Sequence, residues 1–104
     1  MIFIETPTFT ELLANLLSDD EYAEFQKYLA SYPLSGDLIQ YTGGLRKIRW
    51  LAHGKVKGGG VRVIYYYLTH DAQIRLLLIY KKNAQDNLTE KQKKLLRQIN
   101  EGWE

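Results

Sequence analysis

The chain has 104 residues, of which 45% are hydrophobic and 12% aromatic, and it contains no cysteine. This length and composition predict one small globular domain spanning residues 1–104, and they exclude disulfide bonds, thiolate catalysis and cysteine-held metals. No apolar run reaches the roughly 18 residues that cross a bilayer, and the first residues lack the basic start of a signal peptide. We therefore expect a cytoplasmic protein without membrane contact.

The net charge of +2 conceals a strong asymmetry along the chain. Residues 1–37 carry one lysine and seven acids, a net of −6, so the other 67 residues carry +8. Residues 38–70 contain no acid but six basic residues: Arg46, Lys47, Arg49, Lys55, Lys57 and Arg62. Concentrated positive charge is typical of proteins that bind polyphosphates, although a charged surface without a ligand would look the same.

The N-terminal third predicts a short strand followed by two helices. Residues 2–4 favour a strand, and Thr6 with Pro7 is typical of a helix start. Apolar residues then recur with helical spacing: Phe9, Leu12, Leu13, Leu16 and Leu17. Ser18 with Glu21 forms a capping-box pattern that opens a second helix, which Pro33 ends.

From Gly36 onward the pattern changes to strands. Residues 38–41 indicate a short strand, Gly43 and Gly44 a turn, and residues 45–51 alternate in polarity. The alternation places Leu45, Lys47 and Arg49 on one face and Arg46, Ile48 and Trp50 on the other. Residues 61–68 and 74–80 predict a hairpin, with a glycine-rich basic loop before it.

The last predicted element is a helix that starts at Thr89, where Thr89 and Gln92 form a second capping-box pattern. Its expected apolar face consists of Leu95, Leu96, Ile99 and Trp103. The order is thus strand, two helices, an antiparallel meander and a terminal helix, which predicts an α+β fold.

Cations on neighbouring strands are the candidate functional residues. Lys47 and Arg49 share a face, Arg62 opens the next strand, and Lys81 and Lys82 follow the last one. Such a cluster can bind a phosphodiester and stabilise the charge of an in-line displacement, and a crowded lysine can act as a general base. Because RNA supplies its own 2′-OH nucleophile, neither a metal nor a cofactor is required. Simple RNA binding is the alternative.

The ordered motifs GGLRKIRW, GVRVIYY and IYKKN resemble the RelE superfamily of bacterial toxins over essentially the whole chain, most closely its HigB-like branch. The resemblance implies the toxin of a type II toxin–antitoxin pair: a metal-independent, ribosome-dependent endoribonuclease that cuts mRNA in the A site. The ParE-like branch, which poisons gyrase, shares the fold and is the alternative.

By resemblance, the catalytic residues are Lys47, Arg49, Arg62 and Lys82, with Lys47 or Lys82 as general base. Additional RNA contacts would come from Arg46, Lys55, Lys57 and Lys81. RelE also has a tyrosine near its end that stacks on a substrate base, whereas this chain reads Asp86, Asn87 and Leu88 there. The implied partners are the ribosome, mRNA and a HigA-like helix-turn-helix antitoxin, with DNA reached only through that antitoxin.

Overall fold

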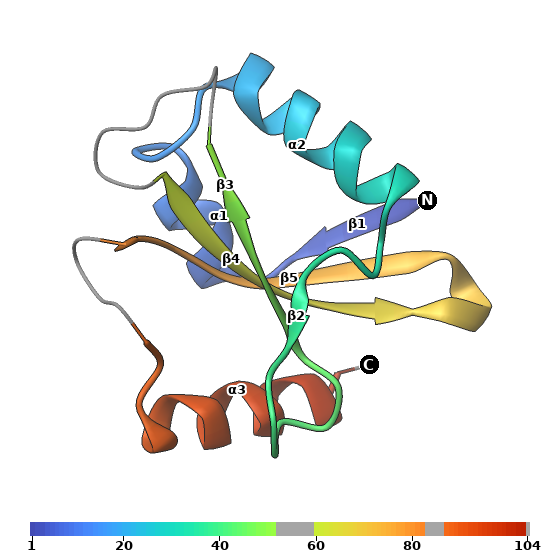
Figure 1. Cartoon of the computed structure of the whole chain (residues 1–104), viewed down its shortest axis with the longest axis vertical. Coiled ribbons are helices and arrows are strands. Elements are labelled where there is room, and N and C mark those ends of the chain that lie inside the picture. Colours follow the sequence, from blue (N-terminus) through green and yellow to red (C-terminus); the bar gives the residue numbers. More distant parts are fainter. Residues whose placement is uncertain (52–59, 83–86, 104) are drawn as a thin grey trace.

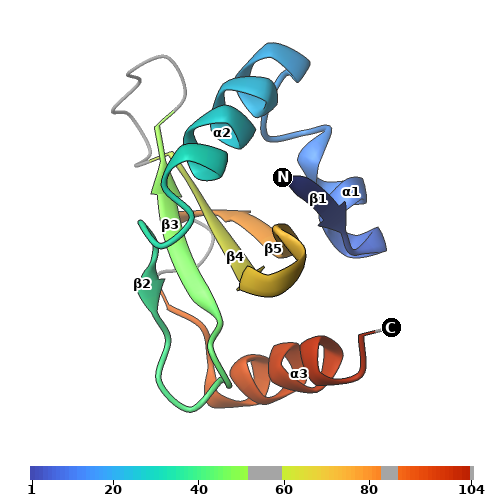
Figure 2. The ribbon, with the colours of Figure 1, turned by 90° about the vertical axis from the view of Figure 1, so that its right-hand side faces the viewer.

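A computed structural model describes residues 1–51, 60–82 and 87–103 of the chain. A five-stranded sheet in the order β1-β5-β4-β3-β2 lies between two helices on one side and one on the other (Figures 1 and 2). The strands are β1 (Ile2–Glu5), β2 (Asp37–Leu38), β3 (Arg46–Trp50), β4 (Val61–Leu68) and β5 (Gln73–Lys81). The helices are α1 (Pro7–Leu13), α2 (Asp19–Ser31) and α3 (Glu90–Glu101). The α+β prediction is confirmed.

The sheet contains both parallel and antiparallel pairs, because the N-terminal strand β1 pairs with β5 near the other end of the chain. Strands β2 to β5 form the predicted antiparallel meander, whereas β1 runs parallel to β5. Thr6 ties this junction together: its hydroxyl donates to the carbonyl of Leu77 at 2.8 Å and accepts from the Phe9 amide at 3.1 Å. The same threonine therefore caps α1 and holds the end of β1 against β5.

Both predicted capping boxes are confirmed, at Ser18 with Glu21 and at Thr89 with Gln92. The first helix, however, is shorter than its apolar spacing predicted. It ends at Leu13, after which the Leu16 amide bonds back to the Leu13 carbonyl in a turn. The chain must reverse before Ser18 can cap α2, and Leu17 still reaches the core from outside the helix.

The other expected strand bounds need small corrections. The strand predicted over residues 38–41 is only the two-residue β2, and β5 extends one residue further at each end than expected. Strand β5 also contains a bulge that the sequence did not reveal. Ile64 pairs with Leu78 and Tyr65 pairs with Leu76, which leaves Leu77 as the extra residue.

Two apolar clusters cover the two faces of the sheet. The α1/α2 face carries the larger cluster, which consists of Phe9, Leu17, Phe25, Leu29, Ile48, Val61, Val63, Tyr65, Ile74, Leu76 and Ile79. The α3 face carries the smaller one, which consists of Leu45, Ile64, Leu77, Tyr80, Leu88 and Leu96. Alternation along each strand divides the side chains between these faces.

The apolar face predicted for α3 was partly wrong. Leu96 is buried, but Leu95 and Ile99 are 55% and 41% exposed. The reason is Asn100, which is buried on the same side of the helix as Leu96 and accepts two bonds from the Arg75 guanidinium at 3.2 Å. This contact, together with Arg75 lying over the Trp103 ring at 5.1 Å, fixes which side of α3 meets the sheet.

In the described part of the chain, no helix is long and apolar enough to cross a membrane.

Candidate RNA-binding and cleavage site

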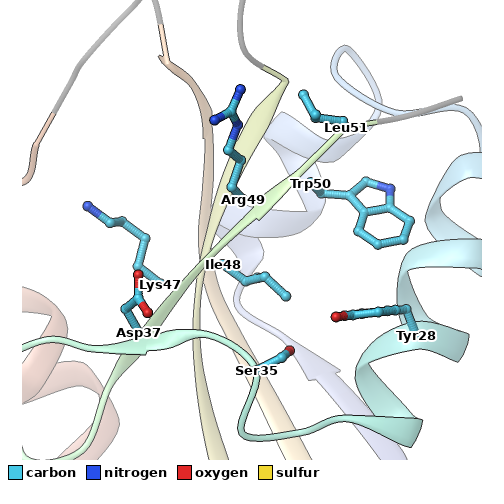
Figure 3. Close-up of a pocket in the computed structure, with 8 residues that line it drawn as sticks. All are labelled: Tyr28, Ser35, Asp37, Lys47, Ile48, Arg49, Trp50 and Leu51. Carbon is cyan, nitrogen blue, oxygen red and sulfur yellow. The ribbon is translucent and has the colours of Figure 1, made fainter. Parts of the chain in front are cut away.

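The predicted division of β3 into two faces is confirmed. Ile48 is buried in the α1/α2 cluster and Trp50 packs against it, whereas Lys47 and Arg49 project from the other side of the strand. Figure 3 shows these two cations side by side, pointing away from Ile48 and Trp50. Arg49 is exposed and Lys47 is half-buried. The two charges therefore stand on the α3 face.

Strand pairing brings Arg62 directly beside Arg49. The register pairs Arg49 with Arg62, and on the far side of β4 it pairs Arg62 with Tyr80. Side chains of directly opposite residues share a face, with Cβ atoms about 4.5–5.5 Å apart. Arg49, Arg62 and Tyr80 thus form one row across three strands, which we call the Arg49–Arg62–Tyr80 row.

Like charges placed directly opposite each other in a sheet repel, and an anion that binds both groups would offset that repulsion. Arg62 is also 8% exposed, so its guanidinium is largely removed from water. A phosphate accepts two parallel hydrogen bonds from a guanidinium, which makes this row chemically suited to a phosphodiester.

The backbone beside this row is fixed by Gly60, which precedes β4. Gly60 has a φ of +68°, and a Cβ at this position would overlap the carbonyl of Trp50. Only glycine therefore permits this close approach at the start of β4, next to the Arg49–Arg62 pair.

Tyr80 was missed by sequence reasoning, which treated it as part of an apolar strand. Its side chain is 9% exposed, and its hydroxyl has no hydrogen-bond partner among the described residues. Burial raises the pKa of Tyr80, and the nearby Arg62 charge only partly offsets this. The phenol therefore stays protonated near neutral pH and can donate to an anion beside Arg62. The bulge in β5 sets the register that pairs Tyr80 with Arg62, and the position of Tyr80 beside Arg62 follows only from that pairing.

The remaining predicted cations are distributed differently. Lys82 is exposed and follows β5 directly, at the end of the sheet where Arg62 lies. Lys81 pairs with Val61, a residue of the α1/α2 cluster, and this places Lys81 on the face opposite to Arg62. Arg46 is also on that face, where its guanidinium donates to the carbonyls of Gly36 at 2.8 Å and Leu34 at 3.3 Å. Lys55 and Lys57 lie outside the described residues.

A groove of about 600 Å³ adjoins the cations along β3. It is lined by Tyr28, Ser35, Asp37, Lys47, Ile48, Arg49, Trp50 and Leu51 (Figure 3). Asp37 lies directly opposite Lys47 in the β2–β3 register. This carboxylate compensates part of the Lys47 charge, so the net positive charge of the site is strongest towards Arg49 and Arg62.

Known structures share this fold. The chain is similar to a chain of the intact E. coli RelBE toxin–antitoxin complex, with a TM-score of 0.59 and 11% identity over 77% of this chain and 94% of the other. It is also similar to a mutant of the E. coli toxin RelE in the free state, with a TM-score of 0.57 and 12% identity over 82% and 86% of the two chains. No family model matches the sequence. The RelE-like fold expected from the sequence motifs is confirmed at the level of structure.

Proposed function

We propose that this RelE-like protein is the toxin of a type II toxin–antitoxin pair, and that it inhibits translation by cutting mRNA on the ribosome. The observation that carries the proposal is the Arg49–Arg62 pair, because two arginines directly opposite each other on one face, one exposed and one largely buried, are suited to bind one phosphate together. The RelE-like fold supports the proposal, since both similar structures are of a bacterial toxin.

The proposed reaction is attack of a ribose 2′-OH on the adjacent phosphorus. A general base, Lys47 or alternatively Lys82, accepts the 2′-OH proton while the bond from phosphorus to the 5′-oxygen breaks. A proton from solvent completes the 5′-OH, and the other product is a 2′,3′-cyclic phosphate that water can hydrolyse to a 3′-phosphate. Arg49 and Arg62 bind the non-bridging oxygens, on which negative charge increases in the transition state.

The chain's own cations supply the charge stabilisation and a lysine supplies the general base in this scheme, so it requires no metal. The proposed partners are mRNA, the ribosome and an antitoxin; the similar E. coli RelBE structure, a toxin–antitoxin complex, supports the last of these. We place the protein in the HigB-like branch, with a HigA-like antitoxin, on the basis of the sequence motifs, and we place its action in the cytoplasm. An antitoxin that covers the cationic face would present acidic side chains there.

The test is to express the wild type, Arg62→Ala and Arg62→Lys in cells and to map the 5′ ends of mRNA while growth is followed. The wild type should arrest growth and produce cuts in phase with codons. Arg62→Ala should lower cleavage about 10²- to 10³-fold, the range for loss of one transition-state donor. Arg62→Lys keeps the charge but loses the two-pronged geometry, so its loss should be intermediate.

Arg97→Ala is the charge-matched control, because Arg97 lies exposed on α3 in a surface pair with Glu101 at 3.1 Å. It should arrest growth like the wild type. Growth arrest with intact messages would instead support a ParE-like inhibitor of gyrase. RNA binding without cleavage would support a non-catalytic RNA-binding module.

A further inference from the structure

The outer edge of β3 is open beside the cations. Strand β2 pairs only with Arg46 and Lys47, so the rest of β3 has no neighbouring strand on that side within the described residues. The Ile39 amide donates to the Leu45 carbonyl on this side at 2.9 Å. Because backbone groups alternate in direction along a strand, those of Lys47 and Arg49 point the same way as those of Leu45. The Arg49 amide and carbonyl therefore face the groove along β3.

The two sides of this edge differ in chemistry. Lys47 and Arg49 lie on one side, while Tyr28 of α2 and Trp50 lie on the other (Figure 3). The Tyr28 and Trp50 rings pack with their centroids 5.5 Å apart, and Tyr28 remains 40% exposed. Tyr32 extends the aromatic surface, with its centroid 5.1 Å from that of Tyr28. Charge, open backbone groups and aromatic surface are thus adjacent in one groove.

We propose that this groove binds one unpaired nucleotide of the RNA strand, with the cleaved phosphate on Arg49 beside Lys47 and the base against Tyr28 and Trp50. Cationic and aromatic groups side by side are the combination that binds single-stranded nucleic acid, because every base has a face that can stack. The Arg49 amide and carbonyl can hydrogen-bond to the edge of the base. This inference rests on the proposed function and names the residues that would hold the nucleotide next to the cleaved phosphate.

A protein strand is the competing occupant, since an open strand edge can also pair with an extended peptide. The exposed aromatic surface and the cations favour the nucleotide. A peptide strand would obtain its affinity from main-chain bonds along the edge and would not depend on the Tyr28 ring. The role of Tyr28 therefore separates the two occupants.

The first test compares Tyr28→Leu and Tyr28→Phe in cleavage of mRNA on ribosomes. Loss of a stacking side chain should lower kcat/KM about 5- to 150-fold, whereas Tyr28→Phe should stay within about twofold of the wild type. The loss should be larger when the contacted base is a purine, which stacks over a greater area. A merely structural role would lower the melting temperature without this dependence on the base.

The second test uses Trp50 as the reporter in a Trp103→Phe background, where it is the single tryptophan. The probe is a single-stranded RNA with a 2′-deoxy residue at the cut position, which binds but cannot be cleaved. It should change the Trp50 fluorescence, and Tyr28→Leu should weaken that binding about 5- to 150-fold.

Cleavage by a folded Tyr28→Leu variant within twofold of the wild type would overturn the inference while leaving the proposed function intact. The protein could instead bind the probe in a Tyr28-dependent way but cut no mRNA. That result would refute the proposed function and support nucleotide binding in the groove.

Discussion

The two faces of the sheet use the same strands for different purposes. On the α1/α2 face, which we call the closed face, two helices cover a continuous apolar cluster. On the α3 face, a smaller cluster meets the Arg49–Arg62–Tyr80 row at Tyr80; of the two charged members of this row, Arg49 is exposed and Arg62 is buried. The closed face holds the strands in register, and that register is what places the cations of the other face in line.

Strand β3 shows the division most clearly. Ile48 and Trp50 pack into the closed face, and Lys47 and Arg49 alternate with them on the other. The mutual repulsion of two directly opposed arginines is a cost to folding. Apolar burial behind the row offsets that cost, at about 25 cal/mol for each Å² of apolar surface removed from water. Stability and function should therefore separate when the faces are changed one at a time.

The largest expected separation is between Ile74 on the closed face and Arg49 on the other. Ile74 is fully buried, so Ile74→Ala should lower the free energy of unfolding by about 2–5 kcal/mol and leave kcat/KM of the folded fraction unchanged. Arg49→Ala should stay within about 0.5 kcal/mol of the wild type in stability and lose cleavage. Urea denaturation combined with ribosome-dependent cleavage measures both effects. A loss of activity in folded Ile74→Ala would contradict the division.

A smaller effect distinguishes two adjacent lysines. Lys82 follows the row, whereas Lys81 lies on the opposite face beside Val61. We expect Lys82→Ala to lower kcat/KM about 10- to 100-fold, and Lys81→Ala to lower it less than threefold. Lys94→Ala on α3, also exposed, controls for the loss of one charge. Equal losses at positions 81 and 82 would mean that only net charge matters.

Two buried tyrosines give the next comparison. The Tyr65 hydroxyl accepts from the Gly36 amide at 2.9 Å and donates to the Pro33 carbonyl at 2.8 Å. Tyr65→Phe should therefore cost about 1–3 kcal/mol of stability, because both partners lose their bond. Tyr80→Phe removes a hydroxyl that has no partner among the described residues, so stability should stay equal or rise. Thermal unfolding of both variants measures these changes in stability. A clear loss of stability in Tyr80→Phe would show that the Tyr80 hydroxyl makes a hydrogen bond in the folded protein.

The smallest expected effect is on alkaline stability. Burial raises the pKa of Tyr22, Tyr65 and Tyr80, and a bond to Glu5 raises that of Tyr22 further. A group whose pKa is raised by folding stabilises below its unfolded pKa of about 10 and loses this contribution as the pH rises. At pH 10 the three together should lower the free energy of unfolding by about 1 kcal/mol relative to pH 8. An unchanged value in urea titrations would contradict the raised pKa values.

Much of the fold was predictable because local signals are strong in this chain. Capping boxes at Ser18 and Thr89, and alternation along β3, depend on neighbouring residues and were confirmed. The parallel pairing of β1, the bulge at Leu77 and the orientation of α3 depend on contacts between distant segments. For the site, alternation predicted the shared face of Lys47 and Arg49. The register that aligns Arg62 with Arg49 and Tyr80, and the opposite placement of Lys81, required the assembled sheet.

Arg49 and Arg62 are proposed to bind one phosphate together. A double-mutant cycle of Arg49→Ala and Arg62→Ala, with kcat/KM for ribosome-bound mRNA as the readout, tests this proposal directly. If both guanidinium groups act on the same phosphate, the double variant should lose at least tenfold less than the product of the two single losses. A double loss equal to that product would show that the two arginines act independently and would contradict the account.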